Sequence, residues 1–108
     1  MSKVLKAVSD PTRRRVLELL RDGPQSAGDL ARHFPFSKPT MSAHFAVLKE
    51  AGLVDAQKVG KQVIYRLRLS VLEDALLGLA QTFGVQMDAA DARRDDTAPS
   101  AATKETSS

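Results

Sequence analysis

The segment from residue 37 to residue 46 carries small, weakly polar side chains at helical spacing. With Ser37 as N-cap and about 100° per residue, the apolar Met41, Phe45 and Leu48 fall on one side. The residues that point away are Pro39, Thr40, Ser42, Ala43 and Ala46. This face suits close approach to a DNA groove, because a hydroxyl can donate or accept a hydrogen bond and a methyl group can contact thymine. The alternative is a solvated face, which would normally carry more charge.

Several polar and basic residues near this face could contact the DNA backbone. Ser37, Lys38 and the N–H groups of the first helical turn could hold a phosphate at the positive end of the helix. His44 lies at the edge of the apolar side, where it either contacts a phosphate or a base edge or is simply half-packed. Lys61 and Gln62 lie at the tip of a predicted hairpin.

The run 13–15 consists of three arginines. By helical phase, Arg13 shares a side with Val16 and Leu17, which predicts that it pairs with an internal carboxylate. Arg14 and Arg15 face outward, and contact with phosphate and simple solvation explain them equally well.

Neither catalysis nor metal binding has a recognisable motif. The absence of cysteine excludes disulfides, thiolate metal sites and cysteine redox switches. The chain has no nucleophile–base arrangement and no glycine-rich phosphate loop. His33 and His44 have no paired carboxylate at ligand spacing. We therefore expect no enzyme activity, no cofactor and no metal.

Helix-capping residues, prolines and glycines along the chain predict the helices and strands that position these residues. Asp10 and Pro11 begin a helix that ends near Gly23, after a short first helix around residues 4–8. A capping box at Ser26 begins a helix that runs through Phe34. The next helix begins at Ser37, where Phe36 and Met41 form a hydrophobic staple. Alternation then predicts a hairpin of 54–59 and 63–69 around Gly60-Lys61, and a capping box at Ser70 opens a last helix to about Gly84.

The predicted fold is mainly α with a two-stranded β-wing, in the order α-α-α-α-β-β-α. A helix-turn-helix followed at once by a basic hairpin is a winged helix, in which the second helix enters the major groove and the hairpin reaches the adjacent backbone. The basic hairpin has a second explanation, since edge lysines also discourage strand aggregation.

Length and charge agree with one small DNA-binding domain. The chain has 108 residues and a net charge of +3, of which residues 1–85 carry +5 and residues 86–108 carry −2. A basic folded part indicates a polyanionic partner. We expect a domain over residues 1–87 and a disordered acidic tail over 88–108. With neither an apolar span nor a signal peptide, the expected location is the cytoplasm.

The last helix carries more apolar surface than a monomer needs. Apolar residues on this helix and on the first one form a plausible dimer seam: Val4, Leu5, Val8, Val71, Leu72, Ala75 and Leu79.

Four stretches resemble the ArsR family of bacterial winged-helix repressors. They are SDPTRRRVLELL (9–20), SAGDLARHF (26–34), SKPTMSAHFAVLKEAGLV (37–54) and GKQVIYRL (60–67). Within the family, SDPTRR and SKPTMSAH are most similar to the SdpR branch, autorepressors that act beside a membrane immunity protein. The resemblance implies a homodimer through the first and last helices that represses by occluding a promoter, and it implies a membrane partner encoded nearby. The two-fold symmetry of such a dimer predicts an inverted-repeat operator.

The metal sites of that family have no counterpart in this chain. The thiolate site would fall at Ser26, Gly28 and Ala31, and the terminal-helix site finds only Glu73 and Asp74 without a histidine. The resemblance therefore predicts a repressor without a metal effector. Two alternatives stay open: a winged-helix module that binds another protein, and a repressor that responds to a small molecule, for which the sequence offers no obvious cavity.

Overall fold

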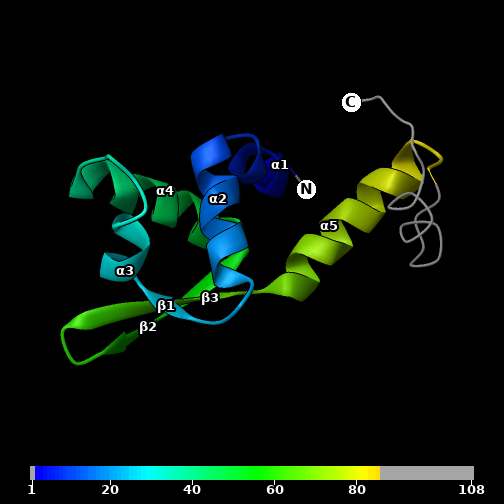
Figure 1. Ribbon diagram of the computed structural model, residues 1–108. Helices are drawn as coiled ribbons and strands as arrows, with labels where there is room; N and C mark the ends of the chain where they lie inside the picture. Colours follow the sequence, from blue (N-terminus) through cyan, green and yellow to red (C-terminus); the bar gives the residue numbers. More distant parts are fainter. Residues whose placement is uncertain (1, 86–108) are drawn as a thin grey trace, which may run out of the picture. The chain divides into compact units, whose positions relative to one another are not determined.

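The computed structural model describes residues 2–85, and these are mainly helical with a small sheet (Figure 1). Among the described residues, those up to Ala75 form one compact unit, and residues 76–85 belong to a second. The predicted tail, 88–108, lies outside the described residues. The elements are α1 (Ser2–Val8), α2 (Pro11–Leu20), β1 (Gln25–Ser26), α3 (Ala27–Ala31), α4 (Lys38–Glu50), β2 (Val54–Val59), β3 (Gln62–Leu67) and α5 (Leu69–Thr82).

The first four helices surround one apolar core, and they pack with the base of the hairpin. The fully buried side chains of this core include Leu30 from α3, Met41 and Leu48 from α4, and Leu53 from the turn that follows α4. The helical stripes expected from the sequence are therefore the buried faces. Among the described residues, no helix is long and apolar enough to cross a membrane.

The predicted starts of α2 and α3 are confirmed by their capping hydrogen bonds. The Asp10 carboxylate accepts from the backbone N–H of Thr12 at 2.8 Å and of Arg13 at 3.1 Å. Ser26 Oγ accepts from the N–H of Asp29 at 3.0 Å, whereas the Asp29 carboxylate pairs with Arg32 instead of closing a capping box. The helix from Ser26 ends at Ala31 and not at Phe34, because turns lead from there towards Pro35.

The sheet has a third strand that the sequence did not predict. Its order is β1-β3-β2, and β1 pairs antiparallel with the central β3 through Gln25 opposite Tyr65 and Ser26 opposite Ile64. The predicted hairpin of β2 and β3 is confirmed, with Val59 opposite Gln62. Gly60 has a φ of 62°, the positive value that its two-residue turn requires.

The start of α5 differs from the prediction. We expected Leu69 to end the strand and Ser70 to cap the helix, but β3 ends at Leu67 and α5 begins at Leu69. The N–H groups of Val71 and Leu72 donate to the carbonyl of Arg68, at 3.1 and 3.4 Å. Leu69 is half exposed, so its apparent place in the alternating pattern did not reflect burial.

Candidate nucleic-acid interface

The outward face of α4 is as open as the helical phase predicts. Met41, Phe45 and Leu48 are buried, whereas the predicted contact residues are exposed: Ser37, Lys38, Pro39, Thr40, Ser42, Ala43 and the neighbouring Ala46. Every side chain on this face between 39 and 46 is small and uncharged. A backbone or groove floor can therefore approach α4 closely along its N-terminal half.

The N-cap of α4 also orients one of these side chains. Ser37 Oγ accepts from the N–H of Thr40 at 3.3 Å and donates to Thr40 Oγ1 at 3.0 Å. Because Thr40 Oγ1 accepts this bond, its own O–H stays available as a donor. Ser37 thus caps α4 and also orients the side chain of Thr40.

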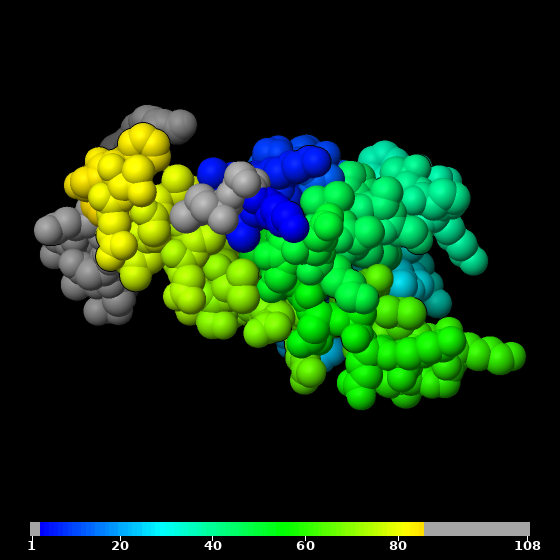
Figure 2. All heavy atoms as spheres, turned by 180° about the vertical axis from the view of Figure 1, so that it is seen from behind, coloured from blue at the N-terminus to red at the C-terminus, as the bar shows by residue number. Residues whose placement is uncertain are grey.

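The hairpin carries exposed cations near its tip, which protrudes from the body of residues 2–75 (Figure 2). Lys58, Lys61 and Gln62 are exposed, and neither lysine forms an ion pair with another residue of the described chain. Arg66 differs, because its Nε lies 3.5 Å from the carboxylate of Asp55 on β2. Lys61 and Lys58 are therefore the hairpin cations open to a phosphate.

The three arginines of α2 have partners that the sequence did not reveal. Among residues 2–85, Arg13 pairs with no carboxylate, contrary to our expectation: its guanidinium donates to the carbonyls of Ala7 and Lys6 and to His44. Arg14 Nη1 donates to the carbonyl of Val8 at 2.9 Å, and Arg15 pairs with Glu18. The last carbonyls of a helix have no partner within the helix. At the end of α1, these carbonyls accept hydrogen bonds from arginines that lie six or seven residues further along the chain.

His44 lies between this arginine cluster and an aromatic side chain. Its Nδ1 lies 3.1 Å from Arg13 Nη1, and its ring centroid lies 6.5 Å from that of Phe36. Nearby, the pKa of Asp10 is lowered: desolvation acts to raise it, but the hydrogen bonds from Arg13 and Thr12 and the charges of His44 and Arg13 outweigh that effect. His44 is half-buried and is fixed by α2 as well as by its own helix.

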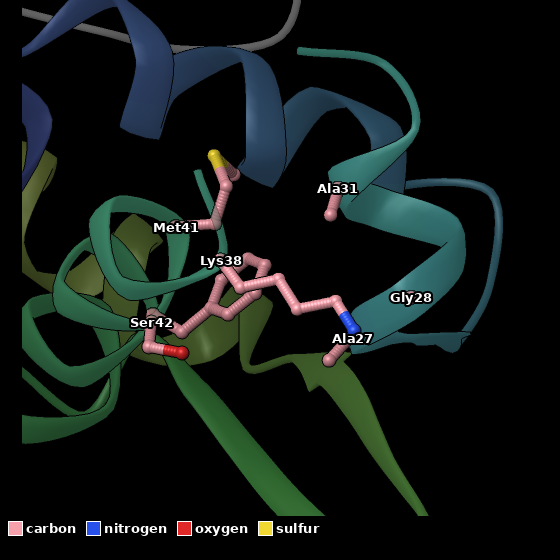
Figure 3. Close-up of a pocket in the computed structure, with 7 residues that line it drawn as sticks. Ala27, Gly28, Ala31, Lys38, Met41 and Ser42 are labelled. Atoms are coloured by element: carbon pink, nitrogen blue, oxygen red, sulfur yellow. The ribbon is translucent and has the colours of Figure 1, made fainter. Parts of the chain in front are cut away.

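A pocket of about 240 Å³ lies between α3 and α4, which the sequence did not lead us to expect. Small residues of α3 (Ala27, Gly28 and Ala31) form one wall, and Met41 and Phe45 of α4 contribute to the other. Figure 3 shows the Lys38 side chain extending from α4 towards Ala27, with Ser42 beside it. Any molecule in this pocket would touch two of the predicted DNA-contacting residues.

The predicted dimer residues differ in how much surface they offer. Val4, Val8, Val71 and Leu72 pack against the core of the first unit, whereas Leu5 is exposed. Ala75 and Leu79 are partly buried. On α5, Leu76 and Leu77 belong to the same apolar surface and are 45% and 48% exposed.

A metal site does not form within the part of the chain that the structure describes. No three side chains of histidine, cysteine, aspartate or glutamate there are close enough to hold an ion. Ser26, Gly28 and Ala31 lie at and within α3, where Ser26 caps the helix and the other two line the pocket.

Comparison with known proteins gives consistent matches. Residues 10–56 match the family model described as bacterial regulatory protein, arsR family. The chain is 45% identical over 76 residues to the transcriptional repressor SdpR of Bacillus subtilis strain 168, covering 70% of this chain and 84% of that protein. A solved structure of a possible transcriptional regulator for arsenical resistance aligns with a TM-score of 0.67 at 40% identity, covering 85% of this chain and 93% of that one.

A further solved structure supports the fold alone. The homodimeric winged helix-turn-helix domain Mb0332 of Mycobacterium bovis aligns with a TM-score of 0.60 at 23% identity, covering 81% of this chain and 85% of that one. The predicted winged helix-turn-helix fold is therefore confirmed.

Proposed function

The chain belongs to the arsR family of bacterial regulatory proteins, and from this we propose that it is a DNA-binding transcriptional repressor that acts as a homodimer on an inverted repeat. Because the members of this family are regulatory proteins, the chain is a regulator and not an enzyme. Since its target is bacterial DNA, we place it in the cytoplasm.

The single observation that carries the proposal is the exposed, small and uncharged face of α4. It lies on the second helix of the helix-turn-helix, with Lys38 at its start and the exposed Lys61 on the hairpin. In such a protein α4 enters the major groove, Thr40, Ser42 and Ala43 meet base edges, and Lys61 and Gln62 contact the adjacent backbone. Ser37, Lys38, Pro39, His44 and Arg14 complete the predicted contact set.

Dimerisation supplies the symmetry of the operator. The apolar residues of α1 and α5 form the proposed seam, to which the exposed Leu76 and Leu77 are added. A two-fold axis places equivalent helices about one helical turn apart, so half-sites should be separated by about 10–11 bp centre to centre.

The chain is similar to the transcriptional repressor SdpR, and the autoregulation and the membrane partner encoded nearby that this resemblance implies are part of the proposal. The replacement of the family's thiolate positions by Ser26, Gly28 and Ala31 supports repression without a metal effector. Titration of zinc, cadmium, copper and arsenite into the protein–DNA complex should then leave its affinity unchanged. A stoichiometric loss of binding with any of them would refute this part of the proposal.

The pocket between α3 and α4 favours one variant of this function, in which a small molecule relieves repression. An occupant would contact Lys38 and Ser42 and would therefore compete with DNA. Screening small apolar carboxylates by thermal shift, with and without DNA, tests this variant; a ligand that stabilises the protein only in the absence of DNA would support it.

The decisive experiment is a footprint on the promoter region of the gene itself, accompanied by selection from a random DNA library. We expect protection of an inverted repeat and enrichment of the same palindrome. Absence of both would refute DNA recognition and would favour the alternative of a winged-helix module that binds another protein.

A further inference from the structure

The Arg13 guanidinium joins three groups from two other parts of the fold. Its Nε donates to the Ala7 carbonyl at 2.8 Å and its Nη2 to the Lys6 carbonyl at 3.0 Å, both at the end of α1. Its Nη1 lies 3.1 Å from Nδ1 of His44 on α4. The planar guanidinium is thus held on one edge by α1 while it faces the imidazole with a remaining N–H.

This contact determines which nitrogen of His44 carries the proton. Arginine has five N–H donors, no acceptor, and stays protonated at any ordinary pH. Nδ1 can therefore form this hydrogen bond only by accepting it with its lone pair. In a neutral imidazole whose Nδ1 accepts, the proton must be on Nε2.

The Nε2–H group that results has no hydrogen-bond partner among residues 2–85, and His44 is only partly buried. His44 lies beside Thr40 and Ala43 around α4, at the edge of the exposed face and not at its centre. A donor at this edge suits a phosphate oxygen, which accepts hydrogen bonds whatever the base sequence.

We propose that Arg13 is a positioning residue for DNA binding: it holds His44 as the Nε2–H tautomer, so that this N–H donates to a phosphate of the operator. The phosphate contact rests on the proposed function, whereas the tautomer is a property of the free protein. Arg13 does not touch DNA in this arrangement.

The tautomer is tested first, in the full chain without DNA. Nitrogen-15 imidazole spectra at about pH 8, where histidines are neutral, distinguish the two tautomers by the shifts of Nδ1 and Nε2. The chain has two histidines, and His33→Gln assigns the signals. We expect His44 almost wholly as the Nε2–H form in the wild type, and a mixture of tautomers in Arg13→Gln and Arg13→Lys. A wild-type spectrum that shows the Nδ1–H form or an even mixture for His44 overturns the proposal, and this measurement needs no variant at position 13 to fold.

The phosphate contact is tested with a matched pair of substitutions at position 44. The side-chain amide of His44→Gln can place an N–H where Nε2 stood, whereas the shorter amide of His44→Asn reaches only the Nδ1 position. We expect His44→Asn to bind operator about tenfold more weakly, because a hydrogen bond to a charged group is lost, and His44→Gln to keep most of the affinity. The loss should be equal for operator and unrelated DNA.

The salt dependence separates this donor from a cationic contact. A neutral imidazole releases no counterion, so the salt slope of His44→Asn should match the wild type while that of Lys61→Ala falls by about one unit. Equal binding by His44→Asn and the wild type overturns the phosphate contact. If the wild type binds no DNA at all, the proposed function fails and takes the phosphate contact with it, whereas an Nε2–H signal that becomes mixed in Arg13→Gln would still support the assignment of the tautomer to Arg13.

Discussion

The ring of Tyr65 on β3 lies 4.8 Å, centroid to centroid, from the ring of Phe45 on α4, with the two planes tilted by 36°. Tyr65 belongs to the central strand, where it pairs with Gln25 on one side and with Ala56 on the other. The pair therefore connects the sheet, and with it the hairpin, to the buried side of the helix whose outer face is exposed. It fixes the hairpin relative to α4 within the first unit.

The pair should be measurable as a coupling energy. Replacing Phe45 or Tyr65 by leucine removes ring contact while keeping an apolar side chain of similar reach. In a double-mutant cycle of urea unfolding, we expect an interaction of about 0.5–1.5 kcal/mol beyond the two separate losses. Additive losses would mean that the two rings do not interact.

Tyr65 should also titrate at unusually high pH. Burial raises the pKa of its phenol above the ordinary 10.0, because the charged phenolate is disfavoured there. The folded state keeps this proton at a pH at which the unfolded state has lost it. The resulting contribution to the free energy of unfolding is fully present below the pKa that Tyr65 has in the unfolded state. It is lost as the pH rises through the higher pKa that Tyr65 has in the folded state.

The titration is simple to follow because the chain has one tyrosine and no tryptophan. Absorbance of the phenolate in the native protein should appear at higher pH than in the urea-unfolded protein. Coincident curves would contradict the assigned burial, and Tyr65→Phe should abolish the signal in both.

The sequence was informative wherever local chemistry decides the structure. The caps at Asp10 and Ser37 follow from side-chain oxygens beside free N–H groups, and the exposed face of α4 follows from helical periodicity. The candidate contact residues on α4 are exposed for this reason, although their contact with DNA stays a prediction.

What the sequence could not reveal depends on contacts between distant residues. β1 is only two residues long and has no period of its own, so only its pairing with β3 defines it. Likewise, helical phase places Arg13 on the apolar side but does not indicate that α1 carbonyls and His44 would receive its N–H groups. The pocket beside Lys38 arises because small residues of α3 face α4, which no local pattern shows.

Two glycines should respond oppositely to alanine. At Gly28, in the first turn of α3, an added methyl group would meet its nearest neighbour, Ser26 Oγ, at an ordinary 3.9 Å. Gly28→Ala should therefore stabilise the protein by about 0.5–1 kcal/mol, because alanine loses less backbone entropy in a helix. Gly52 has a φ of 78°, so Gly52→Ala should destabilise by about 1 kcal/mol or more through backbone strain.

Urea unfolding of the two variants checks both signs. Equal effects at the two positions would contradict the assigned backbone conformations. Since Gly28 also lines the pocket, Gly28→Ala is in addition the variant with which any small-molecule binding there should be compared.

The exposed face of α4 and the hairpin should have separable roles in DNA binding. Thr40→Val removes a hydroxyl whose O–H is available as a donor, and Ala43→Leu fills the space that a groove floor would occupy. Each lost base contact should cost about 1–3 kcal/mol for the preferred sequence and should change or relax base preference. Lys61→Ala should instead weaken all sequences alike and lower the salt slope by about one unit, because one phosphate contact is lost.

Binding isotherms on operator and scrambled DNA at several salt concentrations separate these effects. Lys49→Ala, at an exposed position in the last turn of α4, is the matched control for the loss of a positive charge away from the proposed contact face. It should change neither the preference nor the slope appreciably. If the Thr40 and Ala43 variants keep the wild-type preference while Lys61→Ala changes it, then the hairpin reads the sequence and α4 only positions the protein, and the roles assigned to them are reversed.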